Sequence, residues 1–226
     1  MTIITEGFLG DTAYSVRHLS MQDLVDIEAL QEKVYAALPD QSVLQPLSTK
    51  EFEEILLQER MMLGVFVDDD MIGFRALVEP PVDAEHLGYD CGIAEADFPR
   101  VLYQEISNVS PDFRGFGLQK KMAKWSMEHI DISRYDYICS TVKPGNIPSL
   151  KDKFSQNLIV RALKIKYVDK LRYVFFKDLT ATPKTYEFQV MMDMNDIAGQ
   201  QQLLQDGYVG TGMESFENQW FVRFEK

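Results

Sequence analysis

The sequence has 226 residues, with 23 Lys and Arg against 35 Asp and Glu, which gives a net charge of −12 at pH 7. This balance argues against nonspecific nucleic-acid binding, because displacing counterions from phosphates requires a basic surface. The sequence has no apolar run of about 18 residues and no basic amino-terminal stretch followed by an apolar one. Cys91 and Cys139 lack CxxC spacing, so we expect both to be reduced and buried. These features predict a cytoplasmic protein with neither a membrane span nor an export signal.

Hydrophobic periodicity and capping signals predict alternating strands and helices over the first 179 residues. In chain order we expect a strand at 14–18, helices beginning after Ser20 and at Ser48, a hairpin at 61–67 and 71–78, an irregular loop at 79–98, a strand at 101–109, a helix at 118–130, a strand at 135–142, a helix at 146–157, and a hairpin at 158–167 and 171–179. The three aspartates at 68–70 favour a solvated hairpin turn over a metal site, so no metal is expected.

For residues 180–226 the sequence predicts a C-terminal extension. It consists of a strand at 186–192, a helix at 196–205 and a strand at 220–224. Its strands carry apolar residues that need a partner surface, so we expect the extension to pack on the domain formed by residues 1–179. No internal repeat is visible in the sequence.

One short segment runs against the acidic trend of the chain. Between residues 112 and 125 there are four basic side chains and one acid, Asp112; the basic residues are Arg114, Lys120, Lys121 and Lys124. The segment contains the turn Arg114-Gly115-Phe116-Gly117-Leu118-Gln119, between a predicted strand and a predicted helix. Glycines let the backbone approach an anion without interfering Cβ atoms, and a helix amino terminus favours negative charge. The sequence therefore predicts an anion site at this turn.

The order of elements and this turn resemble the GNAT superfamily of acetyl-CoA-dependent N-acetyltransferases over residues 13–179. The superfamily signature is Gln or Arg, two residues, Gly, one residue, then Gly or Ala, and only Gln119 departs from it here. The preceding Val109-Ser110-Pro111 matches the Val-x-Pro that commonly ends the family's fourth strand. The resemblance implies an α+β (α/β) GNAT acyl-CoA N-acyltransferase fold, with a mixed, mostly antiparallel central sheet flanked by helices.

The resemblance also implies which residues contact the coenzyme. A backbone N–H of Val109 or Asn108 would face the thioester oxygen, and Asn146 and Ser149 would approach the pantetheine arm. Asn146 is equally well explained as a simple helix cap. The expected coenzyme-binding residues are Asn108, Val109, Arg114, Gly115, Phe116, Gly117, Leu118, Gln119, Lys120, Asn146 and Ser149.

Catalysis would require a base, because an amine with a pKa of about 10.4 is protonated at neutral pH. The two-residue period of a strand places Glu105 on one side with Tyr103, Ser107 and Val109. Family members often carry a carboxylate on this strand, so the resemblance implies that Glu105 is the base, directly or through water. The alternative is a sheet-surface or salt-bridged glutamate. The Tyr that many family members use as the acid is absent, because its neighbourhood contains Lys153, Phe154 and Ser155. Ser149, Ser155 or water would replace it, or the thiolate would leave without an acid.

The sequence therefore predicts an N-acetyltransferase that moves an acetyl group from acetyl-CoA to a primary amine by direct attack. The alternative is a non-catalytic GNAT-fold module that binds acyl-CoA or a protein. The expected partners are acetyl-CoA and a small-molecule or peptide amine, without nucleic acid or membrane, and a homodimer is left open. The loop at 79–98 is acidic and favours a cationic acceptor, with a solvated loop as the alternative. His86 in that loop is expected to be solvated, with a contact to the substrate as the alternative.

Overall fold

The structure is a computed structural model that describes residues 2–182 and 184–226. The chain divides into two compact units: unit 1 contains Met1–Val78 and Gln104–Asp131, and unit 2 contains Glu79–Tyr103 and Ile132–Lys226. The strand β5 (Val101–Val109) crosses the boundary, with its first three residues in unit 2 and the others in unit 1. None of the described helices is long and apolar enough to cross a membrane.

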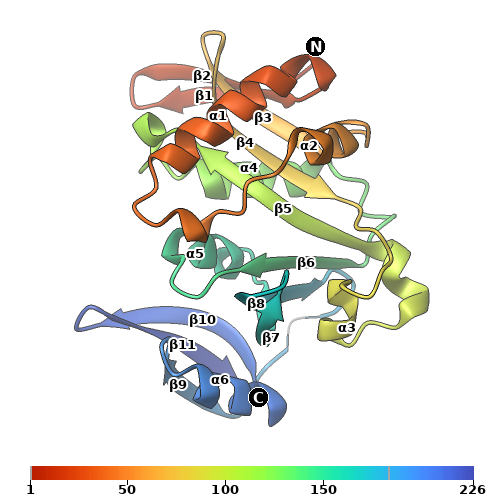
Figure 1. The fold of residues 1–226 in the computed structure, drawn as a ribbon, viewed down its shortest axis with the longest axis vertical. Coiled ribbons are helices and arrows are strands. Elements are labelled where there is room, and N and C mark those ends of the chain that lie inside the picture. Colours follow the sequence, from red (N-terminus) through yellow and green to blue (C-terminus); the bar gives the residue numbers. More distant parts are fainter. Residues whose placement is uncertain (1, 183) are drawn as a thin grey trace. The chain divides into compact units, whose positions relative to one another are not determined.

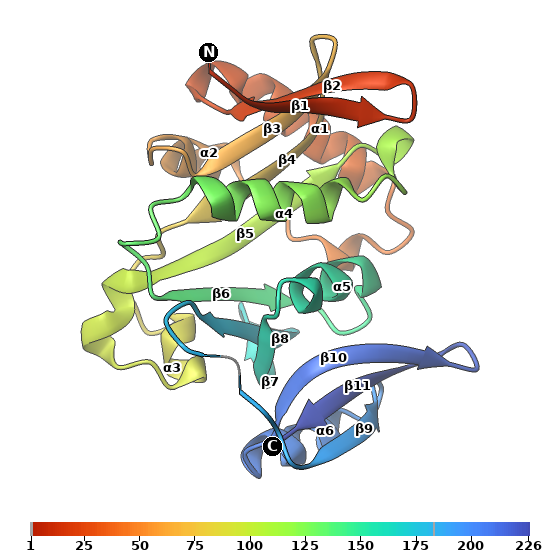
Figure 2. The same cartoon turned by 180° about the vertical axis from the view of Figure 1, so that it is seen from behind.

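Unit 1 is built on a sheet with the strand order β1-β2-β3-β4-β5. Its other strands are β1 (Ile3–Leu9), β2 (Thr12–His18), β3 (Met62–Val67) and β4 (Asp70–Val78), and its α-helices are α1 (Leu24–Ala36), α2 (Thr49–Leu56) and α4 (Leu118–His129). Neighbouring strands from β1 to β4 are antiparallel. The helices α1 and α2 cover one face of this sheet (Figure 1), and α4 covers the other (Figure 2).

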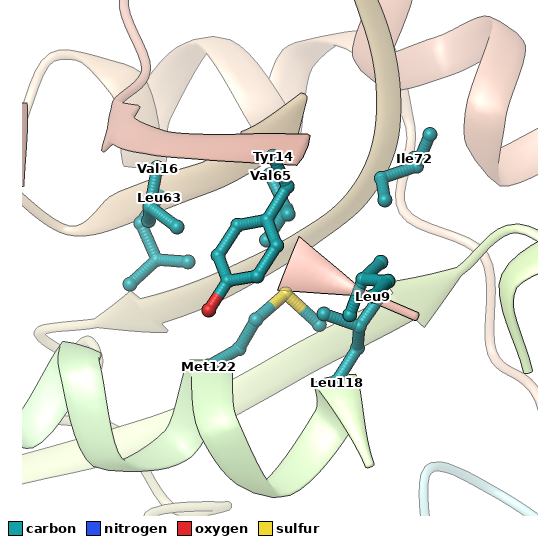
Figure 3. Close-up of a cluster of buried hydrophobic side chains, with 8 residues drawn as sticks. All are labelled: Leu9, Tyr14, Val16, Leu63, Val65, Ile72, Leu118 and Met122. Atoms are coloured by element: carbon teal, nitrogen blue, oxygen red, sulfur yellow. The ribbon is translucent and has the colours of Figure 1, made fainter. Parts of the chain in front are cut away.

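The core of unit 1 fixes the position of α4. Leu118 and Met122 of this helix pack against Leu9, Tyr14 and Ile72 from the sheet, and the Met122 sulfur lies below the Tyr14 ring (Figure 3). Because Leu118 is the first residue of α4 and is almost fully buried, the start of the helix is anchored at the end of the glycine turn. The predicted capping box of α2 is also confirmed, since the Ser48 and Glu51 side chains each bond to the other residue's backbone N–H.

Unit 2 has the strand order β5-β6-β8-β7-β10-β11-β9. Its strands after β5 are β6 (Tyr137–Val142), β7 (Ile159–Lys166), β8 (Lys170–Asp178), β9 (Gln189–Asp193), β10 (Val209–Phe216) and β11 (Gln219–Glu225), and its α-helices are α3 (Leu87–Cys91), α5 (Ile147–Ser155) and α6 (Ile197–Gln205). The β5/β6 pair is parallel and joins Val101–Tyr103 to Tyr137–Cys139. The later pairs are antiparallel.

Among the described residues, two strands and one α-helix were not predicted from the sequence. The edge strand β1 exposes Phe8, which is 70% accessible, so it lacks the burial pattern of an inner strand. The strand β10 was missed because it contains Gly210 and Gly212, and glycine is depleted in strands. The segment predicted as an irregular loop contains α3, because Leu87, Cys91 and Phe98 are buried. The C-terminal segment is consequently a strand, a helix and a hairpin.

Buried hydrogen bonds connect this C-terminal segment to the rest of unit 2. The Tyr173 hydroxyl of β8 donates to Gln200 Oε1 of α6 at 2.6 Å, and burial raises the Tyr173 pKa. Gln201 Nε2 donates to the Leu163 carbonyl of β7 at 2.9 Å. These contacts support the proposal that residues 180–226 form an extension packed on the domain.

Candidate functional site

The strand β5 presents two different faces, as its sequence period predicts. Gln104, Ile106 and Asn108 are buried, whereas Glu105 is exposed and Ser107 and Val109 are partly buried. Glu105 therefore lies on the accessible side of the strand, and its role as the base stays a prediction.

Two buried polar atoms lie near the end of β5 in unit 1. Asn108 is 1% exposed, and its Nδ2 has no hydrogen-bond partner among the described residues. The Ser107 Oγ is buried and likewise lacks a partner in that part of the chain. Buried polar groups are normally hydrogen-bonded. Successive residues of a strand point to opposite faces, so these two atoms lie on opposite sides of β5 near its end.

A tight connection leads from β5 to the glycine turn. The Ser110 N–H donates to the Ile72 carbonyl at 2.8 Å, and the Phe113 N–H donates to the Ser110 carbonyl at 2.9 Å. Gly115 and Gly117 then adopt φ values of +88° and +71°. A Cβ at either glycine would have no atom within 4 Å, so the left-handed backbone rather than crowding requires glycine here.

The amino terminus of α4 has no side-chain cap, because its N-cap residue is Gly117. The first turn of a helix leaves backbone N–H groups without intrahelical acceptors. In α4 these groups belong to Leu118, Gln119 and Lys120, and the Lys121 N–H already donates to the Gly117 carbonyl at 3.1 Å. The turn therefore directs several N–H donors toward the position that an anion would occupy.

The charges around the turn increase its preference for an anion. Arg114 and Lys120 are exposed. The one acid of the segment, Asp112, accepts a hydrogen bond from Lys33 of α1, with 2.7 Å between Nζ and Oδ2. That bond and the charge of Lys33 lower the Asp112 pKa. The negative charge of Asp112 is thus compensated, and the basic residues dominate the turn.

Two members of the turn have less expected environments. Phe116 is 45% exposed, although it is a large apolar residue. Gln119, which occupies the position of the family's small residue, is partly buried, so its side chain lies partly against the protein.

Sequence reasoning missed one charged residue beside β5. Arg75 of β4 is 1% exposed, and its Nη2 donates to Gln104 Oε1 at 2.7 Å. It sits within a run of buried residues that are otherwise apolar or glycine, from Ile72 to Leu77, which is the signal that could have identified it. This pair places a cation in the interior of unit 1, next to the strand that carries Glu105.

Asn146 and Ser149 belong to unit 2, whereas the glycine turn belongs to unit 1. Asn146 is the N-cap of α5, and its Oδ1 accepts from the Ser149 N–H at 3.3 Å. The capping role considered for Asn146 is confirmed, and a contact with pantetheine stays a prediction.

The positions where the family's acid would lie are occupied by other contacts. The Ser155 hydroxyl donates to the Asp152 carbonyl at 2.8 Å, and the Phe154 ring packs against Phe175. Lys153 is buried, with its Nζ 3.5 Å from an Asp152 carboxylate oxygen. Ser155 is therefore a poorer substitute for the acid than the sequence suggested.

The acidic loop after β4 is more neutral than its sequence implies. Glu79 pairs with Arg134 at 2.6 Å. Asp90 pairs with Lys164 at 2.6 Å, and Lys166 lies 3.2 Å from Asp90 and 3.1 Å from Glu85. Half of the six acids in this loop are thus compensated within unit 2, which weakens the argument for a cationic acceptor.

The expectation that His86 is solvated was wrong. His86 is 2% exposed, stacks on Phe98 with ring centroids 4.0 Å apart, and accepts from the Gly88 N–H through Nδ1 at 3.1 Å. Burial lowers its pKa. His86 is a packed residue of unit 2.

Comparison with known proteins gives a result for the structure but not for the sequence. No protein-family model matches the chain, and no curated protein matches its sequence. Many solved structures share its fold.

Three of these structures show the extent of the likeness. A diaminobutyrate acetyltransferase from Paenibacillus lautus, in complex with L-2,4-diaminobutyric acid and coenzyme A, aligns at 14% identity and a TM-score of 0.53, over 76% of this chain and 99% of its own. A GNAT-family acetyltransferase from Listeria monocytogenes aligns at 16% identity and a TM-score of 0.55, over 77% and 100%. An Arabidopsis thaliana protein in complex with the bisubstrate analogue CoA-Ac-MVNAL aligns at 14% and a TM-score of 0.50, over 73% and 98%.

At these identities the likeness establishes the fold. It confirms the predicted mixed, mostly antiparallel sheet flanked by helices. The chain therefore has the fold of the GNAT acetyltransferase superfamily.

Proposed function

We propose that this protein is an N-acetyltransferase that uses acetyl-CoA as cosubstrate. The observation that carries the proposal is the uncapped amino terminus of α4, which follows two left-handed glycines and lies in the basic segment of an acidic chain. A diphosphate needs several N–H donors at once, and this turn supplies them. Solved structures with the same fold contain coenzyme A, which supports the choice of ligand.

In this proposal, the N–H groups of Leu118, Gln119 and Lys120 hold the diphosphate of the coenzyme. Arg114 and Lys120 add charge, and each nearby negative charge gains about 0.3–1 kcal/mol from the helix dipole. The backbone of Asn108 and Val109 is the proposed donor to the thioester oxygen, where a well-placed N–H contributes up to about 3 kcal/mol. Asn146 and Ser149 are the proposed contacts of the pantetheine arm.

Glu105 is the proposed general base, acting directly or through water. A lysine-like amine must lose a proton before it attacks, at a cost of about 4–5 kcal/mol at neutral pH. Glu105 is exposed, and its carboxylate is the proposed acceptor of that proton. The thiolate then takes a proton from water or from Ser149, or leaves without one.

The acceptor is proposed to be a primary amine of a small molecule or a peptide. Both kinds are represented among structures of this fold, one with L-2,4-diaminobutyric acid and one with a peptide-bearing bisubstrate analogue. A cytoplasmic location, as expected from the sequence, completes the proposal.

A second candidate is a non-catalytic module that binds acyl-CoA or a protein. It is favoured by the side chain of Gln119 in the glycine turn and by the absence of Tyr at Lys153-Phe154-Ser155.

Calorimetry with acetyl-CoA, followed by a thiol-release assay over a broad amine panel, separates the two candidates. Binding with turnover of at least one amine supports the enzyme. Binding without turnover of any amine supports a module that binds acyl-CoA. No binding of acetyl-CoA rejects the enzyme and leaves only the protein-binding module.

A further inference from the structure

The C-terminal segment repeats the architecture of the segment that precedes it in unit 2. The series β6, α5, β7 and β8 has the same order as β9, α6, β10 and β11 (Figure 2). The two helices begin at Ile147 and Ile197 and the strands after them at Ile159 and Val209, a constant offset of 50 residues (197 − 147 and 209 − 159).

Local details of the two series agree at the same offset. Asn146 caps α5 by accepting from the N–H three residues later, and Asp196 caps α6 in the same way. A residue with positive φ follows each helix, Asn157 in the first copy and Gly207 in the second. The agreement therefore extends to capping and backbone conformation.

Strand pairing repeats as well. Val160 pairs with Phe175 before a bulge that ends at Ala162, and Gly210 pairs with Phe224 before a bulge that ends at Gly212. The outer strands follow the same rule, since Ser140 pairs with Phe175 in the first copy and Val190 with Phe224 in the second. Matching register and a matching bulge identify residues 187–226 as a second copy of residues 137–177.

The two copies meet through equivalent elements. The strand β7 pairs with β10 at Val160 and Gly210, which are themselves equivalent positions. The contacts across this junction are reciprocal, because α6 of the second copy contacts β7 and α5 of the first copy contacts β10. Reciprocal contacts of equivalent surfaces are the mark of a two-fold, homodimer-like interface.

We propose that the second copy takes the place of a second chain at the edge of β7. An unprotected edge strand is a template for pairing with another molecule, and proteins cover such edges. Gly210 lets the internal partner approach β7 closely. A Cβ at this position would lie 2.9 Å from Val160 Cβ, so a valine here would push β10 away and leave the edge of β7 open to pair with another chain in a different register.

The test uses the full-length protein and a pair of matched glycine variants on β10. Gly210→Val places its side chain against the Val160 Cβ, whereas a Cβ at Gly212 would meet the far end of the flexible Arg223 side chain. We expect wild type to be monomeric by light scattering. Gly210→Val should lose amide protection in β10, melt about 5 °C lower and form concentration-dependent dimers. Gly212→Val should remain monomeric.

A third variant exchanges the two residues at the pseudo-two-fold axis. Val160→Gly combined with Gly210→Val again places one valine opposite one glycine, so the protein should return to a monomer. Three results would overturn the proposal. Gly210→Val could stay monomeric although the amides of β10 lose their protection, or it could behave like Gly212→Val. The third is an exchange variant that does not return to the monomeric state. If Gly210→Val alone does not fold, a folded monomeric exchange variant supports the proposal, and an exchange variant that also fails overturns it.

Discussion

Lys33 of α1 donates to Asp112 of the segment that precedes the glycine turn, with 2.7 Å between Nζ and Oδ2. This ion pair is exposed, so its direct effect on folding stability is small. Its position gives it a second effect, because Asp112 is the one acid among four basic residues between residues 112 and 125. Lys33 compensates the charge that would otherwise repel an anionic ligand.

Removing this compensation should weaken coenzyme binding. We expect Lys33→Gln to lower acetyl-CoA affinity about two- to threefold at low salt, and less at high salt, because added ions screen exposed charges. Lys33→Gln with Asp112→Asn should regain wild-type affinity in calorimetry. Equal affinities for Lys33→Gln and wild type at low salt would show that Asp112 lies too far from the ligand to matter.

The two glycines of the turn should be essential for coenzyme binding. Replacing Gly115 and Gly117 with Val imposes strain of about 1–2 kcal/mol at each left-handed position and places side chains before the N–H donors. We expect at least a tenfold loss of acetyl-CoA affinity. Gly10→Val is a matched control, since Gly10 has φ +61° and equally open space in the β1–β2 turn. A folded double variant with wild-type affinity would contradict the assignment.

The role of Glu105 can be read from the pH dependence of turnover. Glu105→Gln keeps the side chain's size but removes the proton acceptor, so kcat/KM should fall about a hundredfold while acetyl-CoA affinity is unchanged. Glu105→Asp should recover part of the rate. A pH–rate profile that is the same in wild type and Glu105→Gln would assign the base to another group or to water.

A buried histidine, His86, and a partly buried one, His18, should make the protein less stable in mild acid. Burial lowers the His86 pKa below its ordinary value of 6.5. The negative charge of Asp83 raises this pKa, and the positive charge of Lys166 lowers it, so the net shift is downward. Below pH 6.5 the unfolded chain takes up a proton before the folded chain, so the free energy of unfolding falls as pH drops toward the folded pKa. Burial also lowers the His18 pKa, with the same sign.

Melting temperatures between pH 7.5 and about 5 measure this effect. His86→Asn removes the titrating ring and keeps a residue that can cap α3, so its melting temperature should change less with pH than that of wild type. An identical pH dependence for the two proteins would show that His86 does not titrate in this range.

The duplication should not create a second coenzyme site. The repeated segment begins after the glycine turn and α4, and the second copy consequently lacks an equivalent of residues 110–120. Calorimetry should give one acetyl-CoA per chain. A stoichiometry of two would show that the second copy binds the coenzyme without the turn.

The sequence by itself determined β5, the glycine turn, α4 and the alternation that exposes Glu105. These features follow from local chemistry, because glycine spacing, apolar periodicity and capping residues act within a few positions of the chain. The GNAT fold was predicted from the order of these elements along the chain. That order is kept although the sequence is only 14–16% identical to two known structures of the fold.

Only the tertiary structure decided the features that depend on distant contacts. The burial of His86 depends on Phe98, and the charge of Asp112 is compensated by Lys33, which lies 79 residues away in the chain. The repeat was invisible in the sequence because strand register and helix caps tolerate many side chains. The first residues of the two equivalent helices, Ile147 and Ile197, are identical, whereas Val160 corresponds to Gly210. The close approach of β7 and β10 requires a glycine at one of these two equivalent positions.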